Sequence, residues 1–460
     1  MTDKPEGPKS SMTRLKTQPF ERNVALTRLG LGTGGRFVAH SLANVFRNEA
    51  DRETADRDFY RARALALADS LGQLKGSVMK AGQMLSLYGQ YFLPPEAVEI
   101  LAGLQDDTPP VAWSVVQPVL ERALGRKRLA ELEVDERPLA AASLGQAHRA
   151  RRKRDGLELV VKIQYPGVAD AIESDIRSLS RLVGLSRLAP KGLDLDPIFM
   201  EVREMLHREV DYEAEAHFTR TFGERLADRP QFVVPQVIDA YSTDRVLTTT
   251  FESGVSVRHA DVQGLPQARR NALGSWFLEL FLEEFLDWGM VQTDPHFGNY
   301  RIRPSPDGDR IVLLDFGATR VFGRGFIDAY SDIMRGALAR DRARIHEGSR
   351  AIGLMSEHFP APVRDAFARL CEQIVEPFDD PDAGTVPPEL LTADGAYRWG
   401  QSDLLMRVGR IASRNALSMY FRVPPREIVF LHRRLAGVFI MLSTLGCELR
   451  SRETVLKAVG

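Results

Sequence analysis

The chain has 460 residues, which is too long for a single hydrophobic core and predicts two or three lobes. Its 61 Lys and Arg against 62 Asp and Glu give a net charge of -1, so no overall field favours nucleic acid or another polyanion as a partner. The two cysteines, Cys371 and Cys447, provide neither a disulfide framework nor the spacing of metal ligands, which is typical of a reducing compartment.

Neither a signal peptide nor a membrane span is predicted. Residues 1–22 are polar, contain prolines, lack an apolar h-region and are expected to be disordered. Residues 435–447 come nearest to a membrane span, but they are shorter than the roughly 18 residues that a span requires. We therefore expect a cytoplasmic location, with peripheral contact as the closest association with a membrane.

Three glycines, Gly30, Gly32 and Gly35, match the G-x-G-x-x-G pattern of dinucleotide-binding folds. That fold needs a second strand shortly afterwards, whereas residues 37–68 have a polar, helical pattern. A glycine-interrupted amphipathic helix is therefore favoured. Such a helix could pack on the protein or lie on a membrane surface.

Residues 58–104 have helical periodicity with a break at residues 93–95. Within this stretch the apolar residues share one broad face, while Lys80 and Gln83 lie off it and are neighbours on the helix surface. From this segment alone, an amphipathic helix with solvated lysines is the favoured interpretation. A second amphipathic helix is predicted over residues 113–124.

From residue 138 the pattern changes to strands, with a basic turn at residues 151–156. The first strand contains a loop of small residues: Ala140, Ala141, Ala142, Ser143 and Gly145. In enzymes of phosphoryl transfer, such a loop covers the nucleotide phosphates and the next strand carries a lysine to them. We therefore predict that the loop and Lys162, in the string V-V-K-I, contact nucleotide phosphates. A lysine at a strand edge is the alternative.

Residues 170–188 and 195–220 are predicted helices. The second helix carries a cluster of acidic residues: Glu209, Asp211, Glu213 and Glu215. A strand lysine that binds phosphates needs a glutamate partner on a helix. By distance along the chain from Lys162, Glu173 is the first candidate.

Residues 232–235 and 245–254 are predicted as further strands of the N-terminal lobe. The second strand ends at Glu252 and Gly254. We expect a hinge there, with a backbone that hydrogen-bonds adenine.

Residues 271–288 form a strongly apolar predicted helix that leads into residues 291–320. In that stretch two short apolar runs flank the turn signal P-S-P-D-G-D, which predicts a strand hairpin. Asp294 and Asn299 precede the first strand and Asp315 follows the second, so three oxygen-bearing side chains converge at one end of the hairpin. Phosphoryl transfer uses such a set: Asp294 would orient the attacking hydroxyl or water, while Asn299 and Asp315 would hold Mg²⁺.

The interval from Asp294 to Asn299 is that of the kinase D-x-x-x-x-N loop, and a literal D-F-G begins at Asp315. Both motifs in this order favour a kinase-like C-lobe over three residues that cap turns. Helices dominate after residue 320, interrupted by an acidic, proline-containing loop at residues 376–389, and no A-P-E string follows the D-F-G.

Taken in order, these motifs resemble the UbiB-type atypical kinases, also called the AarF or ADCK group, from about residue 59 to about residue 446. The matching strings are K-A-G-Q, A-A-A-S-L-G-Q-A-H-R-A, V-K-I-Q-Y-P-G-V, E-V-D-Y, Q-T-D-P-H-F-G-N and L-L-D-F-G-A-T-R. The resemblance implies an α+β fold that is two-lobed, protein-kinase-like and mostly helical. The implied domains are a disordered N-terminus (1–22), a helical extension with the K-x-G-Q motif (23–136), an N-lobe (137–255) and a C-lobe with C-terminal helices (256–460).

The resemblance also assigns roles to residues of the extension and the acidic cluster. Lys80 and Gln83 correspond to the K-x-G-Q motif, which in this family folds over the active-site cleft. Glu209 and Asp211 correspond to the E-x-D pair that meets the extension at the nucleotide site.

The expected partner of Lys162 becomes Glu215, in preference to Glu173. The alanine-rich loop is the family's own pattern and implies restrained autophosphorylation, so that ATP hydrolysis or small-molecule chemistry is favoured.

Members of this family act in the biosynthesis of ubiquinone and other isoprenoid quinones, usually near a membrane. The resemblance therefore implies an atypical kinase or ATPase that binds ATP or ADP with Mg²⁺. A lipid or quinone precursor and peripheral contact with the inner membrane are the implied partners. The sequence departs from bacterial UbiB proteins in having no predicted pair of C-terminal membrane spans.

Two other functions remain open from the sequence. One is a nucleotide-responsive chaperone or assembly factor for membrane-associated lipid enzymes. The other is a small-molecule phosphotransferase, against which Gln292 counts, because sugar and antibiotic kinases have a histidine at that place.

Overall fold

The structure is a computed structural model. It describes residues 61, 62, 65, 80–82, 84, 85, 98, 110–186, 195–416 and 425–460. The predictions for residues 1–22, for the glycine pattern and for most of the helical stretch 58–104 lie outside the described residues.

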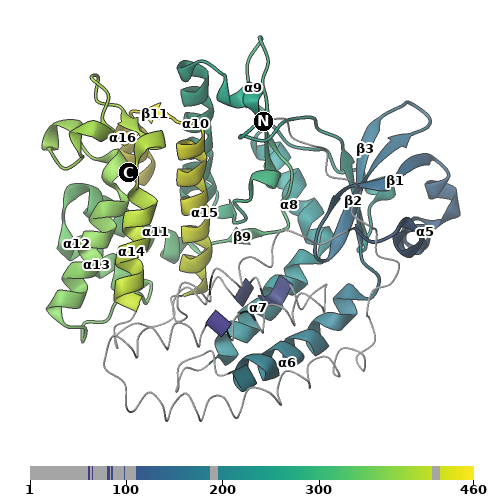
Figure 1. Cartoon of the computed structure of the whole chain (residues 1–460), viewed down its shortest axis with the longest axis horizontal. Helices are drawn as coiled ribbons and strands as arrows, with labels where there is room; N and C mark the ends of the chain where they lie inside the picture. The colour runs from purple at the N-terminus through teal and green to yellow at the C-terminus, as the bar shows by residue number, and fades with distance from the viewer. Residues whose placement is uncertain are drawn as a thin grey trace. The chain divides into compact units, whose positions relative to one another are not determined.

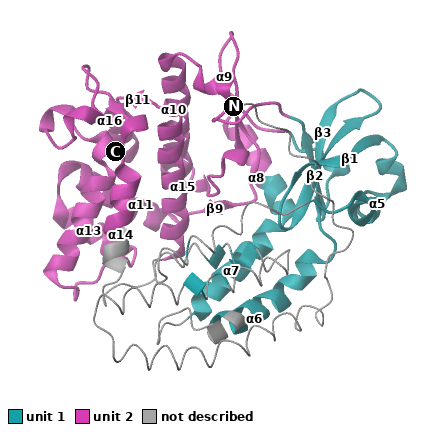
Figure 2. Cartoon of the chain, in the orientation of Figure 1, with its two compact units in different colours: residues 1–217, 236–251 teal, residues 218–235, 252–460 magenta. Residues whose placement is uncertain are grey.

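The chain forms two compact units, drawn in teal and magenta in Figure 2. Unit 1 consists of Met1–His217 and Gln236–Phe251, and unit 2 of Phe218–Pro235 and Glu252–Gly460. The predicted mixed, mostly helical α+β architecture is confirmed. Residues 218–235, which fall inside the N-lobe range expected from the sequence, belong to unit 2.

Unit 1 is built on a four-stranded antiparallel sheet in the order β1-β2-β3-β5, of which β1, β2 and β3 are labelled in Figure 1. Its strands are β1 (Leu132–Ala141), β2 (Gly145–Arg152), β3 (Glu158–Gln164) and β5 (Val246–Thr250). Its helices are α5 (Trp113–Leu129), α6 (Val168–Ser186), α7 (Asp196–Glu209), the short η2 (Asp239–Tyr241) and the first part of α8 (Tyr212–Arg225). In β3 the apolar Leu159, Val161 and Ile163 are fully buried. Because side chains alternate along a strand, Lys162 lies on the opposite face of the sheet.

Unit 2 holds three small sheets: β4-β8-β7, β6-β9 and β10-β11. Their strands are β4 (Phe232–Val233), β6 (Met290–Gln292), β7 (Tyr300–Arg303), β8 (Arg310–Leu313), β9 (Thr319–Val321), β10 (Tyr397–Arg398) and β11 (Glu448–Leu449). The longer helices are α10 (Gln267–Leu282), α11 (Arg324–Ala339), α12 (Arg342–Ala351), α13 (Ala361–Ile374), α14 (Leu404–Ala416), α15 (Arg426–Thr444) and α16 (Arg452–Val459). Short turns of helix complete the unit: α9 (Ala260–Gln263), the π-helical η3 (Glu283–Asp287), η4 (Phe297–Asn299), η5 (Glu376–Phe378), η6 (Pro381–Ala383), η7 (Pro388–Leu390) and η8 (Trp399–Gln401).

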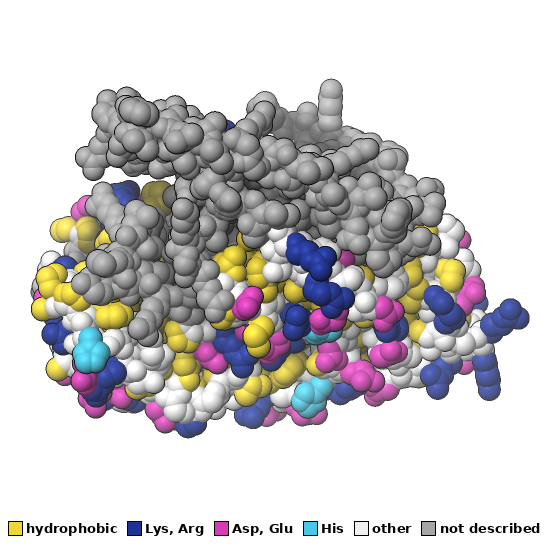
Figure 3. All heavy atoms as spheres, turned by 90° about the horizontal axis from the view of Figure 1, so that it is seen from below, with side chains coloured by type: hydrophobic (Ala, Val, Ile, Leu, Met, Phe, Trp, Pro, Cys, Tyr) yellow, Lys and Arg dark blue, Asp and Glu magenta, His cyan; other side chains and the backbone are white. Residues whose placement is uncertain are grey.

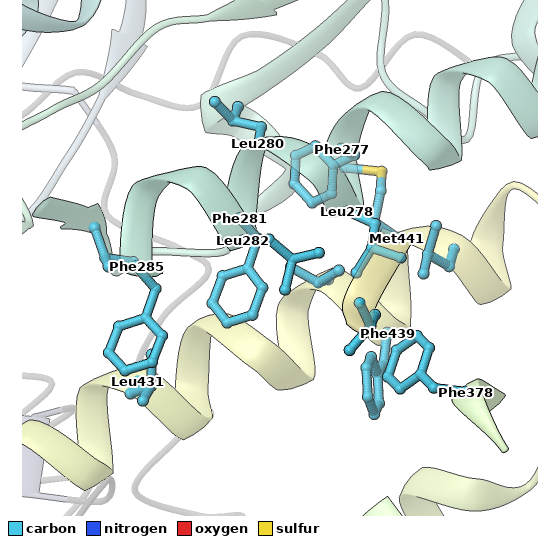
Figure 4. Close-up of a cluster of buried hydrophobic side chains, with 14 of the residues drawn as sticks. Phe277, Leu278, Leu280, Phe281, Leu282, Phe285, Phe378, Leu431, Phe439 and Met441 are labelled. Atoms are coloured by element: carbon cyan, nitrogen blue, oxygen red, sulfur yellow. The ribbon is translucent and has the colours of Figure 1, made fainter. Parts of the chain in front are cut away.

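The core of unit 2 lies between α10 and α15, two helices that are far apart in the sequence (Figure 4). Buried residues of α10 and η3 include Phe277, Leu278, Leu280, Phe281, Leu282 and Phe285, and those of α15 include Leu431, Phe439 and Met441. Each such side chain contributes about 1.5–3 kcal/mol when it is removed from water. This packing holds α15 against the helix that leads into β6, directly before Asp294.

Two expectations about elements are wrong. Residues 232–235 do not join the sheet of unit 1: β4 pairs in parallel with β8, Phe232 opposite Ile311, because Phe232 is buried in the core of unit 2. The single helix expected over residues 195–220 is two helices, α7 and α8. The side chain of Gln164 hydrogen-bonds the carbonyl of Val210 at the break, and the Asp211 carboxylate accepts the Ala214 N–H of the new helix.

The described surface mixes charges of both signs. On the face drawn in Figure 3, Lys and Arg side chains are interspersed with Asp and Glu, in keeping with a net charge of -1. Over the residues that the structure describes, no helix has both the length and the apolar composition needed to cross a bilayer.

Candidate functional site

Lys162 and Glu215 form an ion pair in unit 1. The Lys162 ammonium lies 2.9 and 2.8 Å from the two carboxylate oxygens of Glu215, whose side chain is only 5% exposed. The ammonium also lies 5.2 Å from the ring centre of Tyr212, on the first turn of α8. The structure therefore brings together the lysine and the glutamate that the family resemblance paired, and their role with nucleotide stays a prediction.

Glu173, the first candidate by distance along the chain, has other partners. It lies on α6, half exposed, 3.0 Å from His207 and 3.4 Å from Arg203. The hydrogen bond from His207 is the main cause that lowers the pKa of the Glu173 carboxyl. Glu215, which the family resemblance favoured over Glu173, is the residue beside Lys162, because α8 rather than α6 brings its acidic residue there.

Lys80 meets the acidic end of α7 within unit 1. Its ammonium lies 2.8 Å from the Glu209 carboxylate, and both side chains are partly exposed. Asp211 is two residues on, where it caps α8 through the Ala214 N–H at 2.9 Å. Gln83, the other residue expected from the K-x-G-Q motif, lies outside the described residues.

The alanine-rich loop is the turn between β1 and β2. Ala140 and Ala141 end β1, Ala142 and Ser143 form the turn, and Gly145 begins β2. The loop is closed by the Ala142 N–H, which donates to the Gly145 carbonyl at 2.8 Å. A Cβ on Gly145 would lie 2.6 Å from the Ile163 carbonyl oxygen and 2.8 Å from the Tyr212 hydroxyl, so only glycine fits there. The contact of this loop with phosphates stays a prediction.

The expected hinge residues Glu252 and Gly254 both belong to unit 2. Glu252 accepts a hydrogen bond from Arg303 at 2.8 Å. A Cβ on Gly254 would lie 2.7 Å from the Arg301 Cβ, since the chain here packs tightly on β7 through the Val255–Ile302 bridge. These contacts explain the local shape of the segment, and its contact with adenine stays a prediction.

Asp294 and Asn299 face each other in unit 2, on the segment between β6 and β7. The Asn299 amide nitrogen donates to Asp294 Oδ2 at 2.9 Å. Because the nitrogen faces Asp294, the carbonyl oxygen of Asn299, the atom able to bind a metal ion, points the other way. On its other side, Asp294 Oδ1 accepts from the Arg433 guanidinium at 2.6 Å.

Asp315 follows β8, as the hairpin signal predicts. Its Oδ1 accepts the Gly317 N–H at 2.9 Å, which restrains rotation of the carboxylate. Phe316 of the D-F-G string is fully buried, with its ring centre 4.6 Å from that of Phe222. The hydrophobic anchor thus holds the peptide that carries Asp315.

The donor set fits Mg²⁺, which prefers oxygen ligands and is commonly held by one or two protein groups together with phosphates. Asp315 provides a carboxylate and Asn299 an amide carbonyl. Among the residues that the structure describes, no group of three or more His, Cys, Asp and Glu side chains could hold a metal by itself. Metal ligation by Asn299 and Asp315 would therefore need further oxygens, such as those of a nucleotide.

Sequence reasoning missed a buried polar group beneath Asp294. Glu284, Tyr300 and Arg434 are each at most 2% exposed. Arg434 donates to the Tyr300 hydroxyl at 2.8 Å and to the Glu284 carboxylate at 3.2 Å. Burial raises the pKa of the Glu284 carboxyl to about 7, against the opposing effect of Arg434.

A signal for this group was present in the sequence. The pair Arg433-Arg434 interrupts the otherwise apolar stretch of α15, and a charged pair within a buried helix needs partners. The helix also touches the segment of Asp294 directly, since a Cβ on Gly437 would lie 2.0 Å from the Pro295 Cβ.

Comparison with known proteins shows the family of this chain. A family model described as ABC1 atypical kinase-like domain matches residues 103–349. The mitochondrial atypical kinase coq-8 of Caenorhabditis elegans is 33% identical over 424 residues, which are 91% of this chain and 52% of the worm protein. Atypical kinase COQ8 of Schizosaccharomyces pombe is 33% identical over 84% of this chain and 61% of its own length. The chain thus spans about half to three fifths of these two relatives.

A third relative and a solved structure agree. Atypical kinase COQ8B of Rattus norvegicus, also mitochondrial, is 32% identical over 92% of this chain and 76% of the rat protein. The Rv3197–erythromycin complex from Mycobacterium tuberculosis has a TM-score of 0.57 and 27% identity, and the match covers 88% of this chain and 97% of that one. The chain therefore belongs to the ABC1 atypical kinase-like family, the UbiB-type atypical kinases that its motifs resemble.

Proposed function

We propose that this protein binds an adenine nucleotide with Mg²⁺ and transfers or hydrolyses its terminal phosphoryl group. The observation that carries the proposal is the Lys162–Glu215 ion pair, at 2.8 Å, with the carboxylate buried. In kinase-like proteins this pair must be in place before the lysine can bind the phosphates. A lysine that served only solubility would not be paired with a buried glutamate.

Residues of each unit have a separate role in the proposed reaction. In unit 1, Lys162 binds the α- and β-phosphates, and the loop of Ala140 to Gly145 covers them. In unit 2, Asn299 and Asp315 hold Mg²⁺, which neutralises charge on the phosphates when it is bound. Asp294 orients the attacking hydroxyl or water, since each oxygen of a carboxylate can accept a further hydrogen bond beside those from Asn299 and Arg433.

Lys80 and Glu209 support a gating role for the helical extension. Their 2.8 Å contact ties the K-x-G-Q segment to the end of α7, three positions before Tyr212, where the helix that carries Glu215 begins. In the family that the chain resembles, the K-x-G-Q segment folds over the active-site cleft, where it would restrict access of large acceptors. We therefore expect the acceptor to be a small molecule or water, and the family points to ubiquinone or another isoprenoid quinone pathway, with a lipid or quinone precursor as ligand.

Thermal unfolding with ATP, ADP or AMP, each with and without Mg²⁺, tests the nucleotide site. A ligand at about 100 times its Kd adds roughly 2.7 kcal/mol, which shifts the midpoint by a few degrees. We expect a Mg²⁺-dependent shift in the wild type that Asp315→Asn loses. Asp328→Asn, at an exposed position on α11, is the matched control and should keep the shift.

The absence of a shift with every nucleotide in the wild type would contradict the proposal. If a shift is found, release of inorganic phosphate from ATP and labelling of a lipid extract distinguish hydrolysis from transfer to a small acceptor.

A further inference from the structure

Gln292 lies two residues before Asp294, at the end of β6, and its side chain is buried. Its Oε1 accepts a hydrogen bond from the Asp294 main-chain N–H at 3.1 Å. Its Nε2 donates to the main-chain carbonyl of Asp315, also at 3.1 Å. A single amide therefore contacts the peptide groups of Asp294 and Asp315, two of the three residues on which the proposed chemistry in unit 2 depends.

The donors and acceptors around this amide fix its orientation. Arg434 can only donate, so the Tyr300 hydroxyl must accept from it, at 2.8 Å. The single Tyr300 proton is then directed to Gln292 Oε1, at 2.5 Å. Oε1 consequently faces Tyr300 and the Asp294 N–H, which leaves Nε2 to face the Asp315 carbonyl.

Glu284 closes the set of contacts into a ring. One of its oxygens accepts from Arg434 at 3.2 Å, and the other accepts the main-chain N–H of Gln292, also at 3.2 Å. Both the backbone and the side chain of Gln292 are thus held by groups that are buried. Hydrogen bonds between buried groups restrain the structure around them.

We propose that Gln292 is a positioning residue that fixes the metal-binding Asp315 relative to Asp294. The inference rests on the proposed function. A glutamine provides a neutral acceptor and a neutral donor at once, as the two facing peptide groups require. A carboxylate in its place would set an oxygen against the Asp315 carbonyl. An apolar side chain would leave the Asp294 N–H and the Asp315 carbonyl without this hydrogen-bond partner.

Two other contacts between these segments lie further along the chain than the Asp315 peptide. The β6–β9 pairing joins Gln292 to Thr319, and the Thr293 hydroxyl donates to the Ala318 carbonyl at 2.7 Å. Both hold the chain three or four residues beyond Asp315. The hydrogen bond from Gln292 acts on the Asp315 peptide itself.

Gln146 offers a matched control. Its Oε1 also accepts a main-chain N–H and its Nε2 also donates to a main-chain carbonyl, both of Val111, and its side chain is equally buried. In the register of β2 and β3, Gln146 lies opposite Ile163 whereas Ala147 lies opposite Lys162, so Gln146 points to the other face of the sheet. Gln146→Glu repeats the chemical change in unit 1, away from Lys162.

The experiment titrates Mg²⁺ at fixed ATP and follows the thermal midpoint of the full chain. Gln292→Glu should raise the Mg²⁺ concentration for half-maximal stabilisation on the order of tenfold, as expected for loss of a buried hydrogen bond at the metal ligand. The shift caused by ATP without Mg²⁺ should not change. Gln146→Glu should lower the midpoint without ligand but leave the Mg²⁺ dependence as in the wild type.

Tyr300→Phe provides a second variant if Gln292→Glu does not fold. Loss of the proton that orients Gln292 Oε1 should raise the Mg²⁺ requirement in the same direction, by roughly threefold. An unchanged Mg²⁺ dependence in the Gln292 and Tyr300 variants, with a normal wild-type response, would overturn the inference alone. A wild type that does not respond to ATP and Mg²⁺ would overturn the proposed function and this inference together.

Discussion

Gly437→Ala should weaken unit 2 even though alanine is the better helix former. Gly437 lies inside α15, where replacing glycine by alanine favours the helix by about 1 kcal/mol. The added Cβ would lie 2.0 Å from the Pro295 Cβ. An ordinary contact between carbon atoms is about 3.5–4.0 Å, so helix and loop would have to separate by roughly 1.5–2 Å. Overpacking of this kind costs about 1–3 kcal/mol.

Gly409→Ala is the control that separates the effect of the steric overlap with Pro295 from the effect of helix propensity. Gly409 lies inside α14 and is exposed, and an added Cβ would have no described atom within 4 Å. This variant should gain about 1 kcal/mol. Since propensity is common to both variants, the difference between their free energies of unfolding gives the cost of the overlap, about 1–3 kcal/mol.

Urea denaturation followed by tryptophan fluorescence measures this difference, because three of the four tryptophans lie in unit 2. Displacement of Pro295 should also move Asp294 and reduce the Mg²⁺-dependent response to ATP. If Gly437→Ala proves as stable as Gly409→Ala, α15 is not seated against Pro295 as described, and the reasoning fails.

Three further outcomes follow from buried charges and thiols. Lys162→Met should lower the free energy of unfolding by about 2–4 kcal/mol, because it removes the cation beside a carboxylate that is 5% exposed. In a double-mutant cycle, Glu215→Gln in the same chain should restore much of this loss, and additive effects would contradict the pairing. Burial lowers the pKa of His432 from its ordinary 6.5 to about 4, so the unfolded chain takes up a proton before the folded chain does as pH falls. The contribution of neutral, buried His432 to the free energy of unfolding is therefore complete above pH 6.5 and should fall by about 3 kcal/mol towards pH 4. Denaturation of the wild type and of His432→Gln at both pH values tests this, because the variant should lack this part of the pH dependence. Burial raises the pKa of both Cys371 and Cys447 to about 12, so a thiol reagent at pH 8 should label neither in the native protein and both in urea, whereas rapid native labelling would refute their burial.

Local signals predicted the hairpin and the strand of Lys162 because turn residues and alternating apolar residues act within a few positions. The segment from Asp294 to Asp315 accordingly has the expected strand–turn–strand form. Pairings between distant residues could not be read in this way. Lys162 and Glu215 are 53 positions apart, and from spacing alone Glu173 was the nearer candidate.

The contacts of α15 show the same limit more sharply. Arg433 lies 139 positions from Asp294, and Arg434 lies 150 from Glu284. The sequence shows that two arginines stand in an apolar helix, but the partners that satisfy them are set by how α15 packs on α10. The sheet to which β4 belongs was likewise beyond local patterns, since a two-residue strand carries too little alternation to select a partner.

Residues 218–235 lie in sequence between the two segments of unit 1, yet β4 completes a sheet of unit 2. A backbone cut after Phe251 would leave β4 on the N-terminal fragment and β8 on the C-terminal fragment. Phe222 and Phe232 of the N-terminal fragment, buried in the unit 2 core, would keep the two fragments associated. For the same reason neither unit is formed by one continuous stretch of the chain. Recombination between relatives that preserves both cores would need crossovers at three places, after residues 217, 235 and 251.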